Sequence, residues 1–143
     1  MVSKIARPLI VSAIVLLVLI IPRRINERGF AHEMDAEKAI TTIHTAEMQY
    51  YSEYGRYAAR LAQLGPHSAG LIDEDLARGE KNGFRFLLRS IPAGYSVTVM
   101  PTSSGKHTFY SNQNMTIHVH DGQEPATLSD PVLGGMREIA SAP

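Results

Sequence analysis

Three histidines in the last third of the chain are the best candidates for a metal-binding site. His118 and His120 are two residues apart on a predicted strand, so their side chains share a face, and His107 is expected on the partner strand. Three imidazoles could hold a metal ion. No carboxylate clearly converges on them, although Asp121 is adjacent. The favoured interpretation is exposed polar positions on the solvent face of a sheet, so we predict no metal site.

Two further clusters have plainer interpretations. The acidic residues Asp73, Glu74 and Asp75 could bind calcium, but their spacing matches no EF-hand loop, and a solvated loop or helix N-terminus is favoured. A run of tyrosines could form a binding platform: Tyr50, Tyr51, Tyr54 and Tyr57. More commonly, such a run marks the place where a helix meets a sheet, with rings buried and hydroxyls wet.

The sequence offers no convincing catalytic set. It lacks a Ser-His-Asp order, a G-x-S-x-G motif and an H-E-x-x-H motif, and residues 81–83 (K-N-G) are too short for a phosphate loop. The chain has no cysteine, which excludes thiolate chemistry and disulfides. Its 14 basic and 14 acidic residues give no net charge, so nothing suggests nucleic-acid binding. We therefore predict a protein that is not an enzyme and has no cofactor.

An uncharged apolar run near the N-terminus is the strongest organising feature. Residues 9–21 read LIVSAIVLLVLII. As a helix this run is roughly 20 Å long, or roughly 26 Å from Ile5, against ~30 Å of hydrocarbon. A cleaved signal peptide is disfavoured because Pro-Arg-Arg follows without a small-x-small site. We predict a transmembrane, assembly-competent helix formed by Leu9, Ile10, Val11, Ile14, Val15, Leu16, Leu17, Val18, Leu19, Ile20, Ile21 and Pro22. Flanking charges leave its orientation open.

The remaining chain predicts a small α+β domain. An apolar stripe at spacings of three and four predicts a helix over 31–54, ending near Gly55: Ala36, Ile40, Ile43, Ala46, Tyr50 and Tyr54. Strands are expected at 84–91, 95–100, 107–111 and 115–120, forming an antiparallel meander covered on one face by the helix. The expected fold class is α+β, with a long N-terminal membrane-spanning helix packed on a small antiparallel sheet.

Four segments follow from this pattern. Residues 1–22 are the transmembrane half of the helix, and residues 23–55 are its amphipathic soluble half. Residues 56–122 contain an α/β loop and the sheet of the head. Residues 123–143 are expected to be a loosely ordered tail, with a short helix at 132–139.

Several short motifs resemble those of type IV pilins and the pseudopilins of secretion systems. In such proteins a helix running into T-I-N-T-A-E-x-x-Y-x-x-x-Y-G precedes a small sheet, and here residues 42–47 read T-I-H-T-A-E, with Tyr50, Tyr54 and Gly55 following. Further matches are LAQLG (61–65), LID (71–73), LARGEKNGF (76–84), YSVTVMP (95–101) and FYS (109–111). Together they cover residues 36–117, and Pro22 falls where pilins commonly have a kinking proline.

The resemblance implies a non-enzymatic structural subunit of a type IV pilus or type II secretion filament. It implies partners in membrane lipid and in other pilin-like subunits, with self-assembly through the N-terminal helix, and a location in the bacterial inner membrane with the head in the periplasm or on a surface pilus. The N-terminus departs from the family: Ile5 replaces the mature glutamate, and no leader precedes it. This departure favours the alternative, a monomeric membrane-anchored periplasmic binding module with a pilin-like head.

Overall fold

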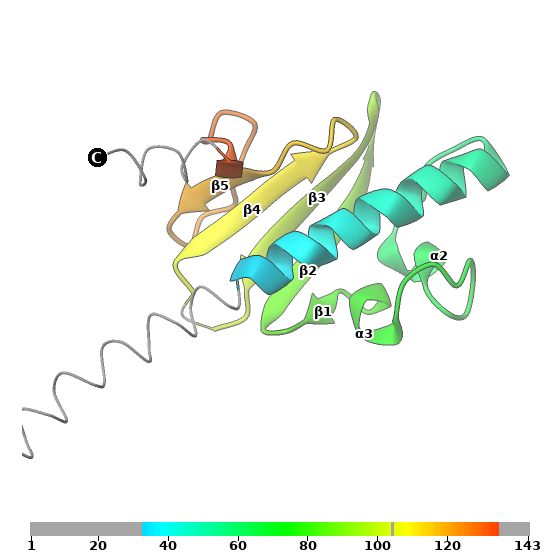
Figure 1. The fold of residues 1–143 in the computed structure, drawn as a ribbon, viewed down its shortest axis with the longest axis horizontal. Helices are drawn as coiled ribbons and strands as arrows, with labels where there is room; N and C mark the ends of the chain where they lie inside the picture. Colours follow the sequence, from blue (N-terminus) through cyan, green and yellow to red (C-terminus); the bar gives the residue numbers. More distant parts are fainter. Residues whose placement is uncertain (1–32, 104, 135–143) are drawn as a thin grey trace, which may run out of the picture. The chain divides into compact units, whose positions relative to one another are not determined.

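The computed structural model describes residues 33–103 and 105–134, which belong to one compact unit, Glu33–Pro143. A long helix at 33–54 packs across one face of a five-stranded antiparallel sheet, as Figure 1 shows. Two short helices lie between the long helix and the sheet in the sequence: α2 (Leu61–Leu64) and α3 (Glu74–Ala77).

The long helix is held by its apolar stripe. Every predicted stripe residue from Ala36 to Tyr50 is buried, whereas Tyr54 is 54% exposed. The helix ends where expected, because Gly55 adopts a left-handed conformation (φ +68°) and donates its N–H to the Tyr51 carbonyl at 2.8 Å. The buried face also includes His44 and Glu47, which are not among the predicted stripe residues.

The sheet is a simple meander in the order β1-β2-β3-β4-β5, with every neighbouring pair antiparallel. Its strands are β1 (Glu80–Lys81), β2 (Phe84–Ile91), β3 (Gly94–Pro101), β4 (His107–Asn112) and β5 (His118–Asp121). Asn82 and Gly83, with φ of 52° and 81°, form the two-residue turn between β1 and β2. The predicted strands over 84–91 and 95–100 are confirmed, whereas β1 was not predicted.

Alternation along the strands separates a core face from an outer face. The side chains that face the long helix are buried: Phe84, Phe86, Leu88, Tyr95, Val97, Val99, Phe109 and Val119. On β2 the intervening Arg85, Leu87 and Arg89 are exposed on the opposite face. The core therefore lies between the long helix and one face of the meander.

The described part of the predicted tail is tied to the sheet. Pro131 accepts the N–H of Val119 at 2.9 Å, and Leu133 donates to the Ile117 carbonyl at 2.9 Å. His118 and Val132 form an antiparallel bridge between these two bonds. Ala126, in the preceding loop, is buried. The segment 131–133 thus lies along the outer edge of β5. Most of the short helix predicted at 132–139 lies outside the described residues.

The predicted fold class and location need correction. The predicted transmembrane helix at 1–22 lies outside the described residues. Over 33–103 and 105–134, no helix is long and apolar enough to cross a membrane. The long helix has a single apolar stripe, with charged side chains such as Glu37, Lys38 and Glu53 elsewhere on its surface. The observed fold is a five-stranded antiparallel sheet with a helix, and the predicted single-pass inner-membrane location is not supported.

Candidate functional site

A hydrogen-bonded chain of buried polar side chains joins the long helix to the sheet. The two ring nitrogens of His44 lie 2.6 Å from the Tyr95 hydroxyl (Nδ1) and 2.8 Å from Ser111 Oγ (Nε2). Ser111 donates its only hydrogen to the Thr116 carbonyl at 2.8 Å. It must therefore accept from Nε2–H, and Nδ1 must accept from Tyr95. This assignment uses the neutral imidazole, and burial accordingly lowers the pKa of His44.

Glu47 lies one turn further along the same helix and is fully buried. Its Oε2 accepts the backbone N–H of Ala58 at 2.8 Å, while Oε1 has no partner among the described residues. Burial raises the pKa of Glu47 to about 7, although the hydrogen bond from Ala58 acts in the opposite direction. Burial also raises the pKa of Tyr95, and the charges of Glu47 and Tyr57 add to that effect.

These groups are placed for structure rather than reaction. His44, Glu47, Tyr95 and Ser111 are each at most 5% exposed, so a substrate in solvent does not reach them. They connect the long helix to β3, β4 and the loop after Gly55. Apolar periodicity missed this cluster. The one sequence signal that includes two of its members is the T-I-H-T-A-E motif, which contains His44 and Glu47.

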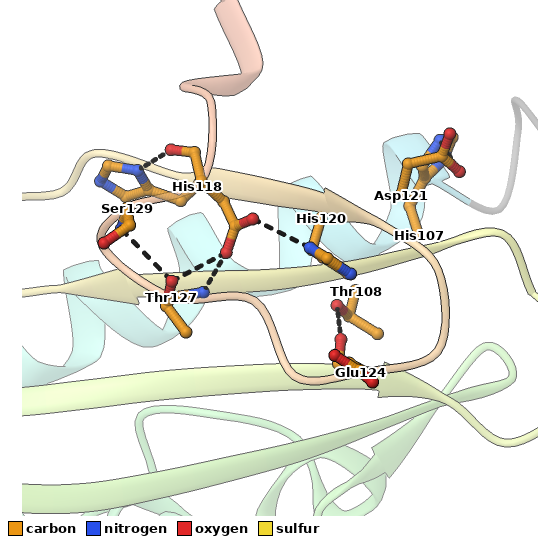
Figure 2. A network of polar contacts seen from close by, with 9 residues as sticks. His107, Thr108, His118, His120, Asp121, Glu124, Thr127 and Ser129 are labelled. Carbon is orange, nitrogen blue, oxygen red and sulfur yellow. Dashed lines mark hydrogen bonds and ion pairs between the residues drawn. The ribbon is translucent and has the colours of Figure 1, made fainter.

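The three candidate metal ligands do not converge. His107 lies opposite Asp121 in the β4–β5 register, and His120 lies opposite Thr108 on the other face. His107 pairs with Glu33 of the long helix, whereas His120 lies 2.9 Å from Asp130 Oδ1. Figure 2 shows His107 beside Asp121 and apart from His120. In the described part of the chain, no group of three or more His, Cys, Asp or Glu residues is placed to hold a metal ion.

The histidines on β5 instead hold the segment that follows the sheet. His118 Nδ1 bonds to the Asp130 carbonyl at 2.8 Å, and the Asp130 carboxylate accepts from the Thr127 N–H at 2.6 Å (Figure 2). Thr108 donates to the Glu124 carbonyl in the same loop. The hydrogen bond from His120 is the main reason that the pKa of Asp130 is lowered. We call the loop 122–131 with these contacts the Asp130 clasp.

The acidic cluster and the tyrosines also have structural partners. Asp73 caps α3 by accepting the Leu76 N–H at 3.0 Å, and its side-chain hydrogen bond with Lys81 lowers the pKa of Asp73. Among the tyrosines, Tyr50 is buried, and Tyr57 packs against Tyr95 at 4.9 Å between ring centres. The aromatic run thus leads from the core to the surface, where Tyr51 and Tyr54 are about half exposed.

The two outer edges of the sheet differ. Residues 131–133 cover the edge of β5. At the other edge, β1 pairs only with Phe84 and Arg85, and Phe86 donates its N–H to Gly79 at 2.7 Å. Beyond Phe86 no backbone partner for the outer side of β2 is found in the described part of the chain. We call residues 87–91 the open edge.

The backbone groups available at the open edge follow from the register. A two-residue turn joins Ile91 to Gly94, so these two residues form a hydrogen-bonded pair. Every second residue of β2 then bonds to β3 through its backbone: Ile91, Arg89 and Leu87. The N–H and C=O groups of Leu88 and Ser90 therefore point away from β3. The outward N–H of Phe86, already bonded to Gly79, fits the same alternation. The open edge is the candidate functional site.

Comparison with known proteins gives one partial similarity. The chain is 32% identical over 93 residues to the glycerol-1-phosphate dehydrogenase (NAD(P)+) of Aeropyrum pernix, a match that covers 62% of this chain and 26% of that protein. The chain thus corresponds to about a quarter of that relative's length. No protein-family model matches the chain. No solved structure matches it either.

These findings overturn the predicted function. A pilin-like structural subunit of a pilus or secretion filament was expected, with a membrane-anchored periplasmic module as the alternative. The reported relative is an enzyme, and the described residues contain no helix that could cross a membrane. The predictions of a pilus, a secretion filament and a transmembrane anchor are therefore corrected. The partners predicted with them, membrane lipid and other subunits bound through residues 1–22, concern residues outside the described part.

Proposed function

We propose that residues 33–134 form a non-enzymatic interaction module that binds an extended segment of another protein along the open edge. The observation that carries this proposal is the asymmetry of the sheet. The β5 edge is covered by residues 131–133, whereas the outer side of β2 has no backbone partner beyond Phe86 among the described residues. An added strand would satisfy the outward backbone groups of Leu88 and Ser90. Recognition by strand addition takes its affinity from such main-chain bonds and its specificity from alternate side chains.

The open edge is suited to a partner because the strand that carries it is packed against the core. Leu88 is buried against the core, which fixes the strand, whereas Leu87 is 40% exposed. An exposed strand edge is a template for pairing with another chain. Here the template is short, because Phe86 bounds it at one end and the turn at Pro92 and Ala93 bounds it at the other.

The non-enzymatic part of the proposal is supported by the placement of the ionisable side chains. Those with the most displaced pKa values, Glu47 and Tyr95, lie inside the domain and join elements of the fold. The histidines on β4 and β5 are engaged with Glu33 and Asp130. The contacts of these ionisable side chains hold elements of the fold together, which is a structural role.

The resemblance of residues 36–117 to pilins and pseudopilins is kept as a proposal about the origin of the fold. What supports it is a long helix packed across an antiparallel meander, with the T-I-H-T-A-E motif at their interface. The resemblance is separate from the binding role proposed here, which depends on the open edge alone.

The proposal is tested with a short, capped, uncharged peptide of alternating Val and Thr, titrated into the full chain. We expect chemical-shift changes at the amides of Leu88 and Ser90. Ser90→Pro removes an outward N–H and should weaken binding, whereas the matched control Ser90→Ala keeps that N–H and should not. A peptide N-methylated on the amides that face β2 tests the same bonds without changing the protein. Equal binding of the methylated and unmethylated peptides would contradict the proposal.

A second candidate function is suggested by the partial match to an NAD(P)-dependent dehydrogenase. The chain would then be one piece of a larger nicotinamide-dependent enzyme. The chain contains no G-x-G-x-x-G motif, and its described sheet is antiparallel, whereas dinucleotides typically bind at glycine-rich turns of parallel sheets. Titration of the full chain with NADH and NADPH, followed by nicotinamide fluorescence, separates the candidates: saturable binding would favour the enzyme and count against the interaction module.

A further inference from the structure

The outward side chains of β2 specify a chemistry for the partner. Arg85, Leu87 and Arg89 alternate on the sheet face that points away from the long helix. Arg85 is already neutralised by Glu80 of β1, with Nη2 and Oε1 3.1 Å apart. Arg89 has no ion-pair partner within the described residues. The open edge therefore presents one unpaired cation beside one exposed aliphatic side chain.

Strand β1 shows how this edge accepts a neighbour. Glu80 lies directly opposite Arg85 in the antiparallel register, so a carboxylate on the adjacent strand reaches an arginine on β2. Opposite charges directly across two strands stabilise the pair. The chain reaches this edge from α3 through Gly79, whose left-handed conformation (φ +87°) redirects it into β1. Residues before Gly79 therefore do not continue along β2. A side chain at Gly79 would also approach the Phe86 carbonyl to 3.0 Å.

We infer that the open edge binds an acidic extended peptide, antiparallel to β2 and continuing the line of β1. Its carboxylate lies opposite Arg89, and an aliphatic side chain two residues away lies opposite Leu87. This repeats, at Arg89, the pairing that Glu80 makes with Arg85. The inference rests on the proposed function and adds the charge and spacing of the partner.

A second copy of this chain is a poorer occupant of the same edge. Two β2 strands paired antiparallel about Leu88 would place each Arg89 opposite Leu87 of the other copy. The two Arg89 side chains would then be diagonal neighbours, within reach of each other. Strand β2 reads FRFLLRSI and contains no carboxylate to offset them. Charge complementarity therefore favours an acidic segment of a different sequence.

The test compares three short capped peptides in which Val alternates with Glu, Gln or Lys, each titrated into the full chain. The Glu peptide should bind roughly two- to fivefold more tightly than the Gln peptide, with the Lys peptide weakest, and added salt should reduce the difference. Arg89→Glu should reverse the order of the Glu and Lys peptides. The charge-matched control Lys106→Glu, at an exposed residue before β4, should leave the order unchanged.

The outcomes separate the two proposals. Equal binding of the Glu, Gln and Lys peptides at Leu88 and Ser90 would overturn the acidic preference and leave the interaction module standing. No binding of any peptide would overturn both. A concentration-dependent dimer that protects the Ser90 amide without peptide would assign the edge to a second copy and overturn the inference. A preference for Glu that survives Arg89→Glu would also overturn it, because Arg89 would not be the recognising group.

Discussion

The carboxylate of Glu47 accepts the backbone N–H of Ala58 at 2.8 Å, which ties the loop after the long helix to the helix itself. Both residues are completely buried. The other oxygen, Oε1, has no partner among the described residues, so the ionised form is poorly solvated. This relationship makes the stability of the fold depend on pH.

The first prediction concerns Glu47. Its pKa rises from an ordinary value of 4.5 to about 7 on folding, so the folded state holds the proton more tightly than the unfolded state. The free energy of unfolding should therefore fall as the pH rises between these values, by about 3 kcal/mol at most, and then level off. Glu47→Gln should remove this slope in chemical denaturation, whereas the exposed control Glu53→Gln should retain it. An unchanged slope in Glu47→Gln would contradict this account.

His44 should act in the opposite direction. Because burial lowers its pKa below 6.5, the folded state resists protonation, and the stability that His44 contributes is lost as the pH falls from 6.5 towards its folded pKa. In the Glu47→Gln background, where the opposing slope is gone, acidification should therefore destabilise the protein. An NMR titration of the imidazole signals measures this directly. Protonation of His44 at or above pH 6.5, the ordinary value for a histidine, would refute the prediction.

Removal of the Tyr95 hydroxyl should destabilise the domain. Tyr95→Phe leaves Nδ1 of His44 buried without its donor, at a cost of about 1–3 kcal/mol in the free energy of unfolding. Ser111→Ala should have a similar effect through Nε2. Because both residues act on one imidazole, the two effects should be non-additive in a double-mutant cycle. Strict additivity would show that the three side chains do not form one network.

The Asp130 clasp should hold residues 131–133 on β5. Asp130→Ala removes the acceptor for His120 and Thr127, and we expect faster hydrogen exchange at the amides of Val119 and Leu133. Since the pKa of Asp130 is lowered, the same loosening should appear in the wild type as the pH falls below 3.8 and through that lowered pKa. Asp121→Asn, at a more exposed carboxylate, is the matched control. If exchange at Val119 is unchanged in Asp130→Ala, backbone pairing alone holds the segment.

Local patterns in the sequence predicted the helix, its end at Gly55 and the alternating strands β2 and β3, because these depend on apolar periodicity and turn residues. The polar interior was not predicted. Apolar periodicity treats His44 and Glu47 as polar and so predicts that they are exposed. Their burial is stabilised by hydrogen-bond partners from β3, β4 and the loop at Ala58. The same limit applies to the histidines: spacing placed His118 and His120 on one face, but strand register put His107 on the other.

The candidate site could not be read from the sequence for a related reason. The open edge exists because the chain turns away at Gly79 and β1 covers only the first two residues of β2. A strand's neighbours are set by the whole topology, and the composition of β2 resembles that of a paired strand. Arg85 and Arg89 indicate an exposed face of β2, but they do not show which edge of the strand is left without a neighbour.

The most direct test of the open edge is hydrogen exchange at the backbone amide of Ser90, measured by NMR on the full chain with and without the alternating Glu–Val peptide. In the free protein, Ser90 should exchange quickly, whereas Leu87 and Arg89, bonded to β3, should exchange slowly. Adding the peptide should slow exchange at Ser90 and Leu88 and leave Val119 unchanged. A Ser90 amide that is protected before peptide is added, or that stays unprotected at saturating peptide, would contradict the account.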